Sequence, residues 1–174
     1  MLKVIGIALL LLIAGVLVLA AFRPDTFRVQ RAATIKAPPE RIFALINDFS
    51  RWTAWSPWER KDPAMKRSFG ATSGKGATYA WEGNKDVGQG SMEIAESLPP
   101  SRVAIRLDFV KPFEAHNLVE FTLQPEGEAT TVNWAMQGRT PYFAKIIHLF
   151  FDMDRMVGND FEAGLANLKA AAER

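Results

Sequence analysis

The hydrophobic pattern begins with a segment unlike any other part of the chain. Residues 4–22 form an uninterrupted run of 19 uncharged residues, twelve of them Leu, Ile or Val. At 1.5 Å per residue, a helix of this length reaches about 28 Å, close to the ~30 Å hydrocarbon core of a bilayer. The run has no polar face, so a helix buried in a soluble core does not explain it. We therefore expect a transmembrane anchor in residues 1–25 and a separate folded domain in residues 26–174.

A cleaved signal peptide is the competing interpretation of this run. Lys3 would supply its short positive segment, and residues 18–20 (Val-Leu-Ala) resemble a small-residue cleavage site. The run is, however, longer than the roughly 7–15 apolar residues of a usual signal core. We therefore favour a retained anchor, which makes this a single-pass membrane protein held through residues 4–22.

The charges around the run leave the side of the membrane open. Arg23, Arg28, Arg31 and Lys36 follow it, and the positive-inside rule would keep these residues, and the domain, in the cytoplasm. Lys3 and the amino terminus instead hold the opposite end of the run inside, as in an uncleaved export signal. Of the two arrangements we favour the outward one, with the domain on the periplasmic or extracellular face.

After the apolar run, the pattern becomes that of short helices and then of strands. Residues 27–36 alternate as a first strand, and Pro38 and Pro39 then begin a short helix with an apolar face. A second short helical piece is expected to end at Pro57. Residues 65–137 show a period of two broken by turn residues, which predicts about six further antiparallel strands.

The last pattern predicts one long helix from about Pro141 to Ala172, because apolar residues recur there every three or four positions. Gly158 and Gly164 cost roughly 1 kcal/mol each compared with Ala inside a helix, so we expect close packing or a bend at both. A curved antiparallel sheet can bury one of its faces around such a helix. The predicted fold class is therefore α+β, with the helices on one side of the sheet.

Composition removes several function classes. The 21 Lys and Arg residues nearly balance the 19 Asp and Glu residues, and they form no basic cluster of the kind that binds nucleic acid. The absence of cysteine excludes disulfides, thiolate metal ligands and a cysteine nucleophile. The two histidines, His116 and His148, are too few for a His-rich metal site, and we interpret them as surface or helix-capping residues. No metal, cofactor or nucleic-acid partner is expected.

Two segments of the domain carry a resemblance to a known family. Residues 37–58 (APPERIFALINDFSRWTAWSPW) and 158–168 are similar to the START-like, or SRPBCC, superfamily, especially its polyketide cyclase/dehydrase and lipid-transport-like branch. The likeness covers about residues 27–174. It implies a helix-grip fold, in which a sheet of about seven strands wraps around a long C-terminal helix and encloses a cavity for hydrophobic molecules. Because members include carriers, hormone binders, cyclases and co-chaperone modules, the fold alone does not select a function.

Aromatic and methionine residues on the predicted inward faces are the candidate ligand-binding residues. Methionine suits an adaptable pocket because its side chain is flexible and polarizable. Plain core packing is the competing interpretation of each of them. The candidates are Trp55, Phe69, Tyr79, Trp81, Met92, Phe109, Phe121, Trp134, Met136, Phe150, Met153 and Val157.

Three tryptophans gather near the short helices and have two interpretations. Trp52, Trp55 and Trp58 could gate the entrance of the cavity or rest at a membrane surface, where Trp is favoured. Alternatively, they hold the short helices against the sheet. The sequence does not choose between these roles.

The leading function hypothesis is a membrane-anchored domain that binds or carries a lipid or other hydrophobic small molecule in an internal cavity. A cyclase/dehydrase-like enzyme is the main alternative, and it needs a buried ionisable group, for which Glu82 and Glu96 are candidates. A protein-interaction module without a ligand is the third. No catalytic triad, phosphate-binding glycine loop or metal-ligand spacing is found, so catalysis is the less favoured hypothesis.

Overall fold

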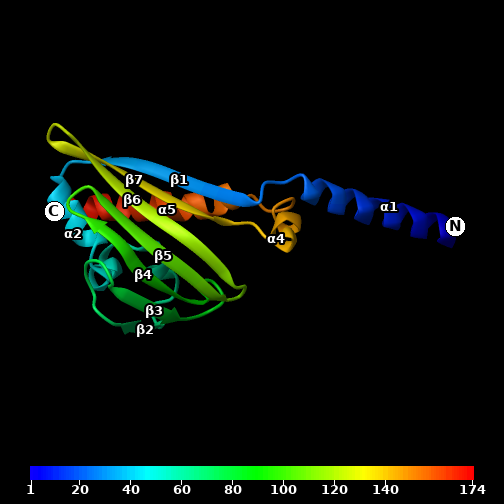
Figure 1. Ribbon diagram of the computed structural model, residues 1–174, viewed down its shortest axis with the longest axis horizontal. Helices are drawn as coiled ribbons and strands as arrows, with labels where there is room; N and C mark the ends of the chain where they lie inside the picture. Colours follow the sequence, from blue (N-terminus) through cyan, green and yellow to red (C-terminus); the bar gives the residue numbers. More distant parts are fainter.

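One apolar helix projects from a domain of sheet and helices in the computed structural model (Figure 1). The structure describes residues 1–174 except the side chain of Leu2. Helix α1 spans Leu2–Ala21, and only 6% of its Lys3–Ala21 segment is buried. By length and composition this helix can cross a membrane, and a signal sequence would have the same properties.

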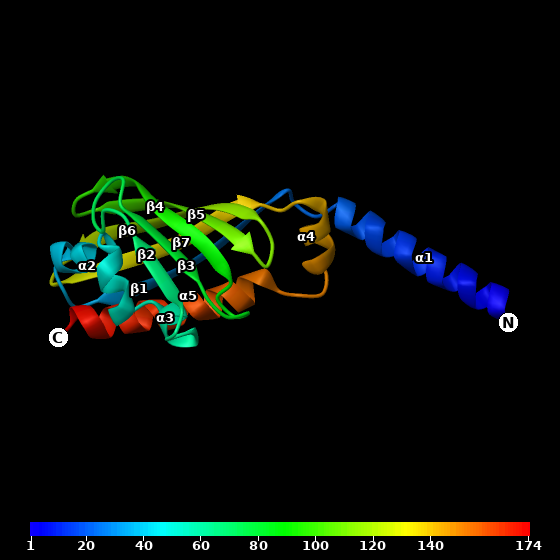
Figure 2. The same ribbon diagram turned by 90° about the horizontal axis from the view of Figure 1, so that it is seen from below.

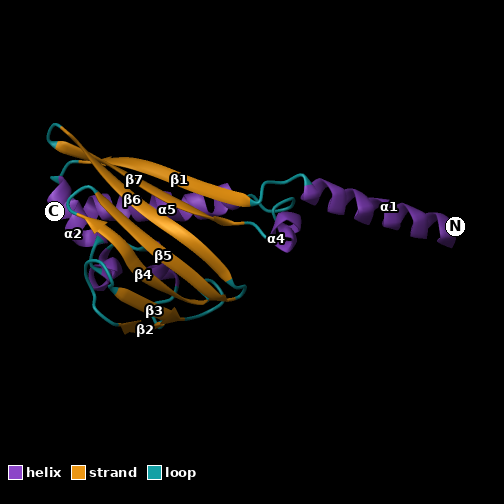
Figure 3. Cartoon of the chain, in the orientation of Figure 1, coloured by secondary structure: helices purple, strands orange, loops and turns teal.

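The domain is built on one seven-stranded antiparallel sheet, as the sequence predicted (Figure 3). The strands are β1 (Thr26–Ile35), β2 (Lys66–Phe69), β3 (Thr78–Glu82), β4 (Gln89–Leu98), β5 (Arg102–Lys111), β6 (Ala115–Glu126) and β7 (Ala129–Arg139). Their order across the sheet is β1-β7-β6-β5-β4-β3-β2. Every strand from β2 to β7 therefore pairs with its neighbour in sequence, and β1 closes the far edge against β7.

The period-two pattern determines which side chains face the core. Val103 pairs with Phe121, and Phe121 pairs with Trp134, so these three side chains from β5, β6 and β7 share one face. All three are almost completely buried. Alternate residues, such as Arg102 and Arg106, lie on the opposite face and pair with glutamates there. We call these the inner and outer faces of the sheet.

Short helices follow β1 at the end of the domain away from α1. Helix α2 spans Pro39–Ile46, the 3-10 helix η1 spans Phe49–Ala54, and α3 spans Pro57–Lys61. The predicted helix start at the two prolines is confirmed. The helical piece that carries Trp52 stops before Pro57, as expected, with Trp55 as its C-cap. Pro57 itself begins α3, because proline is well tolerated in the first turn of a helix, where its missing N–H leaves no bond unmade.

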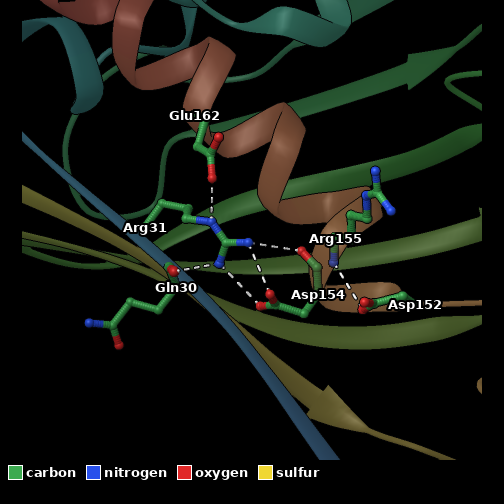
Figure 4. Close-up of polar contacts among 6 residues, drawn as sticks. All are labelled: Gln30, Arg31, Asp152, Asp154, Arg155 and Glu162. Carbon is green, nitrogen blue, oxygen red and sulfur yellow. Dashed lines mark hydrogen bonds and ion pairs between the residues drawn. The ribbon is translucent and has the colours of Figure 1, made fainter.

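The predicted single C-terminal helix is in fact two helices. Helix α4 spans Tyr142–Ile147 and α5 spans Met153–Ala172. The Asp152 side chain caps the start of α5 by accepting a hydrogen bond from the Arg155 backbone N–H (Figure 4). The apolar pattern gave no sign of the break, because Phe143, Ile146 and Phe150 keep the helical spacing across it. Asp152, a residue type that is typical of the N-cap position, was the sequence feature that marked the start of a second helix.

Helix α5 lies along the inner face of the sheet (Figure 2). Its buried residues Phe161, Leu165 and Leu168 belong to the main core. The predicted close packing at its glycines is confirmed. A Cβ at Gly164 would lie 2.6 Å from the Trp134 ring and 3.2 Å from Pro57, so this position has no room for a side chain.

An ion-pair cluster fastens the first half of α5 to β1 (Figure 4). Arg31 extends from the inner side of β1, with its Nη2 2.9 Å from Asp154 Oδ2 and its Nε 2.8 Å from Glu162 Oε1. Its guanidinium fits over α5 because Gly158 has no side chain to block it. The hydrogen bonds from Arg31 lower the pKa of Asp154 below its usual value, so the pair stays charged at neutral pH.

Replacing each helical glycine by alanine tests whether its neighbours can move to make room for a methyl group. We expect Gly164→Ala to lower the free energy of unfolding by up to about 2 kcal/mol, because overpacking a core costs about 1–3 kcal/mol and the gain in helix propensity offsets about 1 kcal/mol of this. Gly158→Ala is the matched control, since its neighbour is the flexible end of Arg31, and it should change stability much less. Thermal and urea unfolding of the full chain in detergent micelles would show this; equal losses would contradict the packing account.

Candidate functional site

An aromatic cluster occupies the inner face of the sheet under α5. Trp134 from β7 stacks on Phe161 from α5, with ring centroids 4.1 Å apart and planes 10° from parallel. Phe121, Trp55 and Trp58 surround Trp134 at centroid distances of 4.9, 5.6 and 5.8 Å. Trp134 therefore lies at the centre of a cluster drawn from four separate parts of the chain.

The indole N–H of Trp134 is the unusual polar group of this cluster. The indole nitrogens of Trp52, Trp55 and Trp81 each donate to a backbone carbonyl oxygen at 2.9–3.1 Å. Trp134 is only 2% exposed, yet its Nε1 has no hydrogen-bond partner among the residues that the structure describes. An unsatisfied buried donor costs about 1–3 kcal/mol. This N–H is thus available to an acceptor on a bound molecule or to a buried water.

Packing is looser toward the start of α5. Phe161 is fully buried, but Val157, one turn earlier, is only partly buried, and Met156 is exposed. On the sheet, Phe27 and Phe109 at the same end are also only partly buried. The inner face therefore has two halves that differ in burial. The half around Trp134 is fully buried, and the half toward the first residues of β1 and the start of α5, which we call the looser half, is less completely buried.

A buried polar cluster lies beside the aromatic residues, at the β2–β3 edge. Glu59 of α3 accepts a hydrogen bond from the Tyr79 hydroxyl at 2.8 Å through Oε1. Its Oε2 lies 2.6 Å from Nη2 of Arg67, and the Glu59 side chain is only 7% exposed. Burial, followed by the bond to Glu59, raises the pKa of Tyr79. The phenol therefore stays protonated at neutral pH, and both carboxylate oxygens of Glu59 are occupied.

The sequence analysis missed Glu59, because it stands in the first turn of a short helix, where an acidic residue is ordinarily explained by the helix dipole. The candidates that it named instead face away from the core. Glu82 is exposed, and Glu96 pairs with Arg102 on the outer face. A buried ionisable group therefore exists, but at a different residue.

The predicted ligand-binding residues do not all lie together. Most share the inner face or pack beneath it: Trp55, Tyr79, Trp81, Met92, Phe109, Phe121, Trp134, Met136 and Val157. Met153, one turn before Val157 on α5, is partly buried outside this core. Phe69 lies at the sheet edge, where it contacts the Tyr79 ring but remains 39% exposed. Phe150 lies between α4 and α5 with its side chain exposed, apart from the others. Their role in binding a ligand stays a prediction.

Two hollows in the surface open mainly on the outer face. One, of about 370 Å³, is bordered by outer-face residues such as Ser68, Ala80 and Ser91. The other, of about 760 Å³, includes Arg106 and His116. His116 is exposed there, as expected, and its bond to Asp108 raises its pKa. The inner face around Trp134 is filled by side chains, so a ligand there would have to displace some of them.

The tryptophans near the short helices hold these helices against the sheet, which is the second of the two roles considered for them. Trp52 and Trp55 are buried, and Trp58 packs on Trp134 and Phe161. Figure 1 shows α2 at the end of the domain away from α1, so this region is remote from a membrane crossed by α1.

Within the described side chains, no group of three or more His, Asp or Glu residues could hold a metal ion.

The comparisons with known proteins agree with this architecture. Residues 26–173 match the model of a family described as polyketide cyclase/dehydrase and lipid transport. No curated protein is matched by the sequence.

Several solved structures are similar to this one at low sequence identity. Protein CV1439 from Chromobacterium violaceum is 16% identical with a TM-score of 0.61, covering 87% of this chain and 99% of that chain. The Aha1 dimer from Colwellia psychrerythraea is 17% identical with a TM-score of 0.61, covering 84% and 96%. Major latex-like protein 151 from Panax ginseng is 11% identical with a TM-score of 0.61, covering 87% and 100%. These likenesses show the fold.

The family match extends over nearly the whole domain, and the curved seven-stranded sheet with its C-terminal helix is the architecture that the resemblance implied. The chain therefore belongs to the polyketide cyclase/dehydrase and lipid-transport family of the SRPBCC superfamily.

Proposed function

We propose that this protein is a membrane-anchored domain that binds a lipid or other apolar molecule on the inner face of its sheet, beside Trp134. The observation that carries the proposal is the unpartnered indole N–H of Trp134 within an otherwise apolar cluster. A ligand with a single oxygen acceptor, such as an acyl carbonyl or a hydroxyl, would satisfy this donor while its apolar part replaces core contacts. Membership of a family that includes lipid transport supports the same ligand class.

The ligand would occupy the looser half of the inner face. It would extend from Trp134 along Met136 on β7 and beneath Val157 and Met153 on α5, which are less completely packed than Phe161. Burying about 300 Å² of ligand surface would contribute roughly 7 kcal/mol before the costs of association. Methionines at both sides of this space can change rotamer at small cost, which suits a site that is closed without its ligand.

We further propose that α1 is a retained anchor and that the domain lies on the outward face. The positive-inside argument against this arrangement rested on the basic residues after α1. That rule counts Lys and Arg whether or not they are ion-paired in the folded domain, so these residues remain an argument for the cytoplasmic alternative. The outward arrangement rests on Lys3 and the amino terminus, which hold the other end of α1 inside, as in an uncleaved export signal.

A cyclase/dehydrase-like enzyme is the second candidate, and the Glu59–Tyr79 pair is the observation that favours it. Together they supply a buried carboxylate and a phenol at the inner face, which are the groups that general acid–base chemistry requires. The ion pair with Arg67 favours a structural role, because it occupies the second carboxylate oxygen.

Native mass spectrometry of residues 26–174 tests the binding proposal. This segment corresponds to nearly the full chains of the similar structures, so it can be prepared without α1. We expect a bound apolar molecule whose mass is lost on denaturation. Trp134→Phe should weaken binding by about 2–10-fold, the equivalent of one hydrogen bond of about 0.5–1.5 kcal/mol. Trp52→Phe is the control. A protein that remains empty after exposure to a membrane lipid extract would contradict the proposal.

The mass of the bound molecule in a Glu59 variant distinguishes a carrier from an enzyme. In Glu59→Gln, a carrier should hold the same molecule as the unmodified protein and lose about 1.5–3 kcal/mol of stability, since a charged hydrogen bond to Arg67 is weakened. A dehydrase should instead hold, in the variant, a molecule heavier by one water. The two masses and a urea unfolding curve distinguish these cases.

Orientation is checked with a thiol placed on the domain. The chain has no cysteine, so Glu128→Cys in the β6–β7 turn introduces a single exposed thiol. We expect a membrane-impermeant maleimide to label it in intact cells or spheroplasts. Labelling only after the membrane is permeabilised would place the domain on the cytoplasmic side.

A further inference from the structure

Exposed apolar side chains of the domain gather at one end. Within residues 26–174, nine large hydrophobic side chains are exposed, and seven of them lie at the end of β5, in the β5–β6 turn, in α4, in the α4–α5 link or in the first turn of α5. Scattered exposed hydrophobic residues are normal, but a group of this kind marks an interaction surface. We call six of these seven the apolar platform; each is 46–69% exposed: Phe113, Tyr142, Phe143, Phe150, Phe151 and Met156.

The parts of the platform are joined to one another and to α1. The Phe113 and Phe143 rings, from the β5–β6 turn and α4, have centroids 6.1 Å apart. The Tyr142 hydroxyl donates to the Leu17 backbone carbonyl of α1 at 2.7 Å, and Ala20 of α1 is completely buried. Figures 1 and 2 both show α4 between the sheet and α1. The platform therefore continues directly from the last turn of the apolar helix.

An ion pair fixes the orientation of α4. Lys145 is only 6% exposed, and its Nζ pairs with Asp25 in the link between α1 and β1. The Asp25 carbonyl also accepts a hydrogen bond from the Thr140 backbone N–H at 2.7 Å. With its one charged residue held on the domain side, α4 presents Phe143 outward.

These contacts determine the depth at which the platform would lie. Leu17 is four residues before the end of α1, or about 6 Å along its axis. If α1 spans the hydrocarbon core, its last turn reaches the boundary with the headgroups, and α4 beside Leu17 lies at that boundary. Tyr is favoured at this depth, and Phe is typical of the apolar face that an interfacial helix buries there; five of the six platform residues are Phe or Tyr.

We propose that the apolar platform docks into the interfacial layer of the bilayer that α1 spans, as a second membrane contact of the domain. The inference rests on the proposed anchoring by α1. The lipid surface is the occupant that fits, because the hydrogen bond from Tyr142 to Leu17 joins the platform to the membrane helix within a single chain. Docking places the looser half of the inner face, at Met153 and Val157, next to the bilayer, from which an apolar ligand could enter.

Fluorescent labels at single introduced cysteines test this in the full chain, which has no cysteine of its own. Phe113→Cys and Phe150→Cys report on the platform, Leu9→Cys on α1, and Glu128→Cys on the far end of the domain. Each variant is labelled with an NBD dye and reconstituted in phosphatidylcholine vesicles with lipids brominated at two depths. We expect blue-shifted emission at positions 113 and 150, and quenching that places the dye about 5–10 Å into the headgroup–acyl boundary.

The other two labels make failure interpretable. Leu9→Cys should be quenched most by lipids brominated deep in the acyl chain, and Glu128→Cys should be quenched by neither lipid. Quenching at position 9 with labels at 113 and 150 as water-exposed as that at 128 would overturn the docking proposal and leave the anchor standing. No quenching at position 9 would overturn both. Blue-shifted labels at 113 and 150 that no brominated lipid quenches would indicate a protein partner and overturn docking.

Discussion

The contact between α5 and β7 is the constraint on which the inner face depends. Gly164 allows the helix backbone to approach Trp134 so closely that the Trp134 and Phe161 rings stack at 4.1 Å. With this distance set, the tryptophans of the short-helix region can pack around Trp134 from the other side. Within this packing the Trp134 N–H is left without a hydrogen-bond partner among the described residues. The tight contact between α5 and β7 and an unpartnered buried donor therefore meet at one residue.

The two ends of the domain differ as a consequence. At the end away from α1, α2 and η1 cover the sheet and the core is fully closed. Toward the other end, the ion pairs of Arg31 hold α5 to β1 in addition to apolar contacts, and Val157, Phe27 and Phe109 are only partly buried. Charged contacts near a surface exchange with water more readily than a packed core. The end beside α1 is thus the part of the domain best suited to open.

Much of the fold could be predicted because it depends on local pattern. Alternation at Val103, Ile105 and Leu107 identified an inward strand face without knowledge of its partners. The break between α4 and α5 was missed, since a continuous apolar stripe serves equally for one helix and for two helices that bury different faces. The start of α5 at Asp152 is set by a cap that is local but weak compared with that stripe.

The candidate site was predictable only in part, because local pattern does not show which distant residues meet in the folded domain. Pattern placed Tyr79 and Trp134 on the inner face. It could not pair Tyr79 with Glu59, because the two are 20 residues apart and meet only when α3 docks on the sheet. Nor could it distinguish Trp134 from the other tryptophans, since an unpartnered N–H is a property of the assembled core. Helical spacing also predicted Phe150 as part of a cavity wall, and the structure places its exposed side chain in the link between α4 and α5.

The central claim is that an apolar molecule binds beside Trp134, and indole NMR tests it most directly. The five tryptophans give five indole N–H signals, which single Trp→Phe variants assign. On addition of a membrane lipid extract to ¹⁵N-labelled residues 26–174, the account predicts that the Trp134 signal moves downfield and exchanges more slowly with water. The signals of Trp52 and Trp55, already bonded to backbone carbonyls, should change little. An unchanged Trp134 signal, while another indole responds, would contradict the claim.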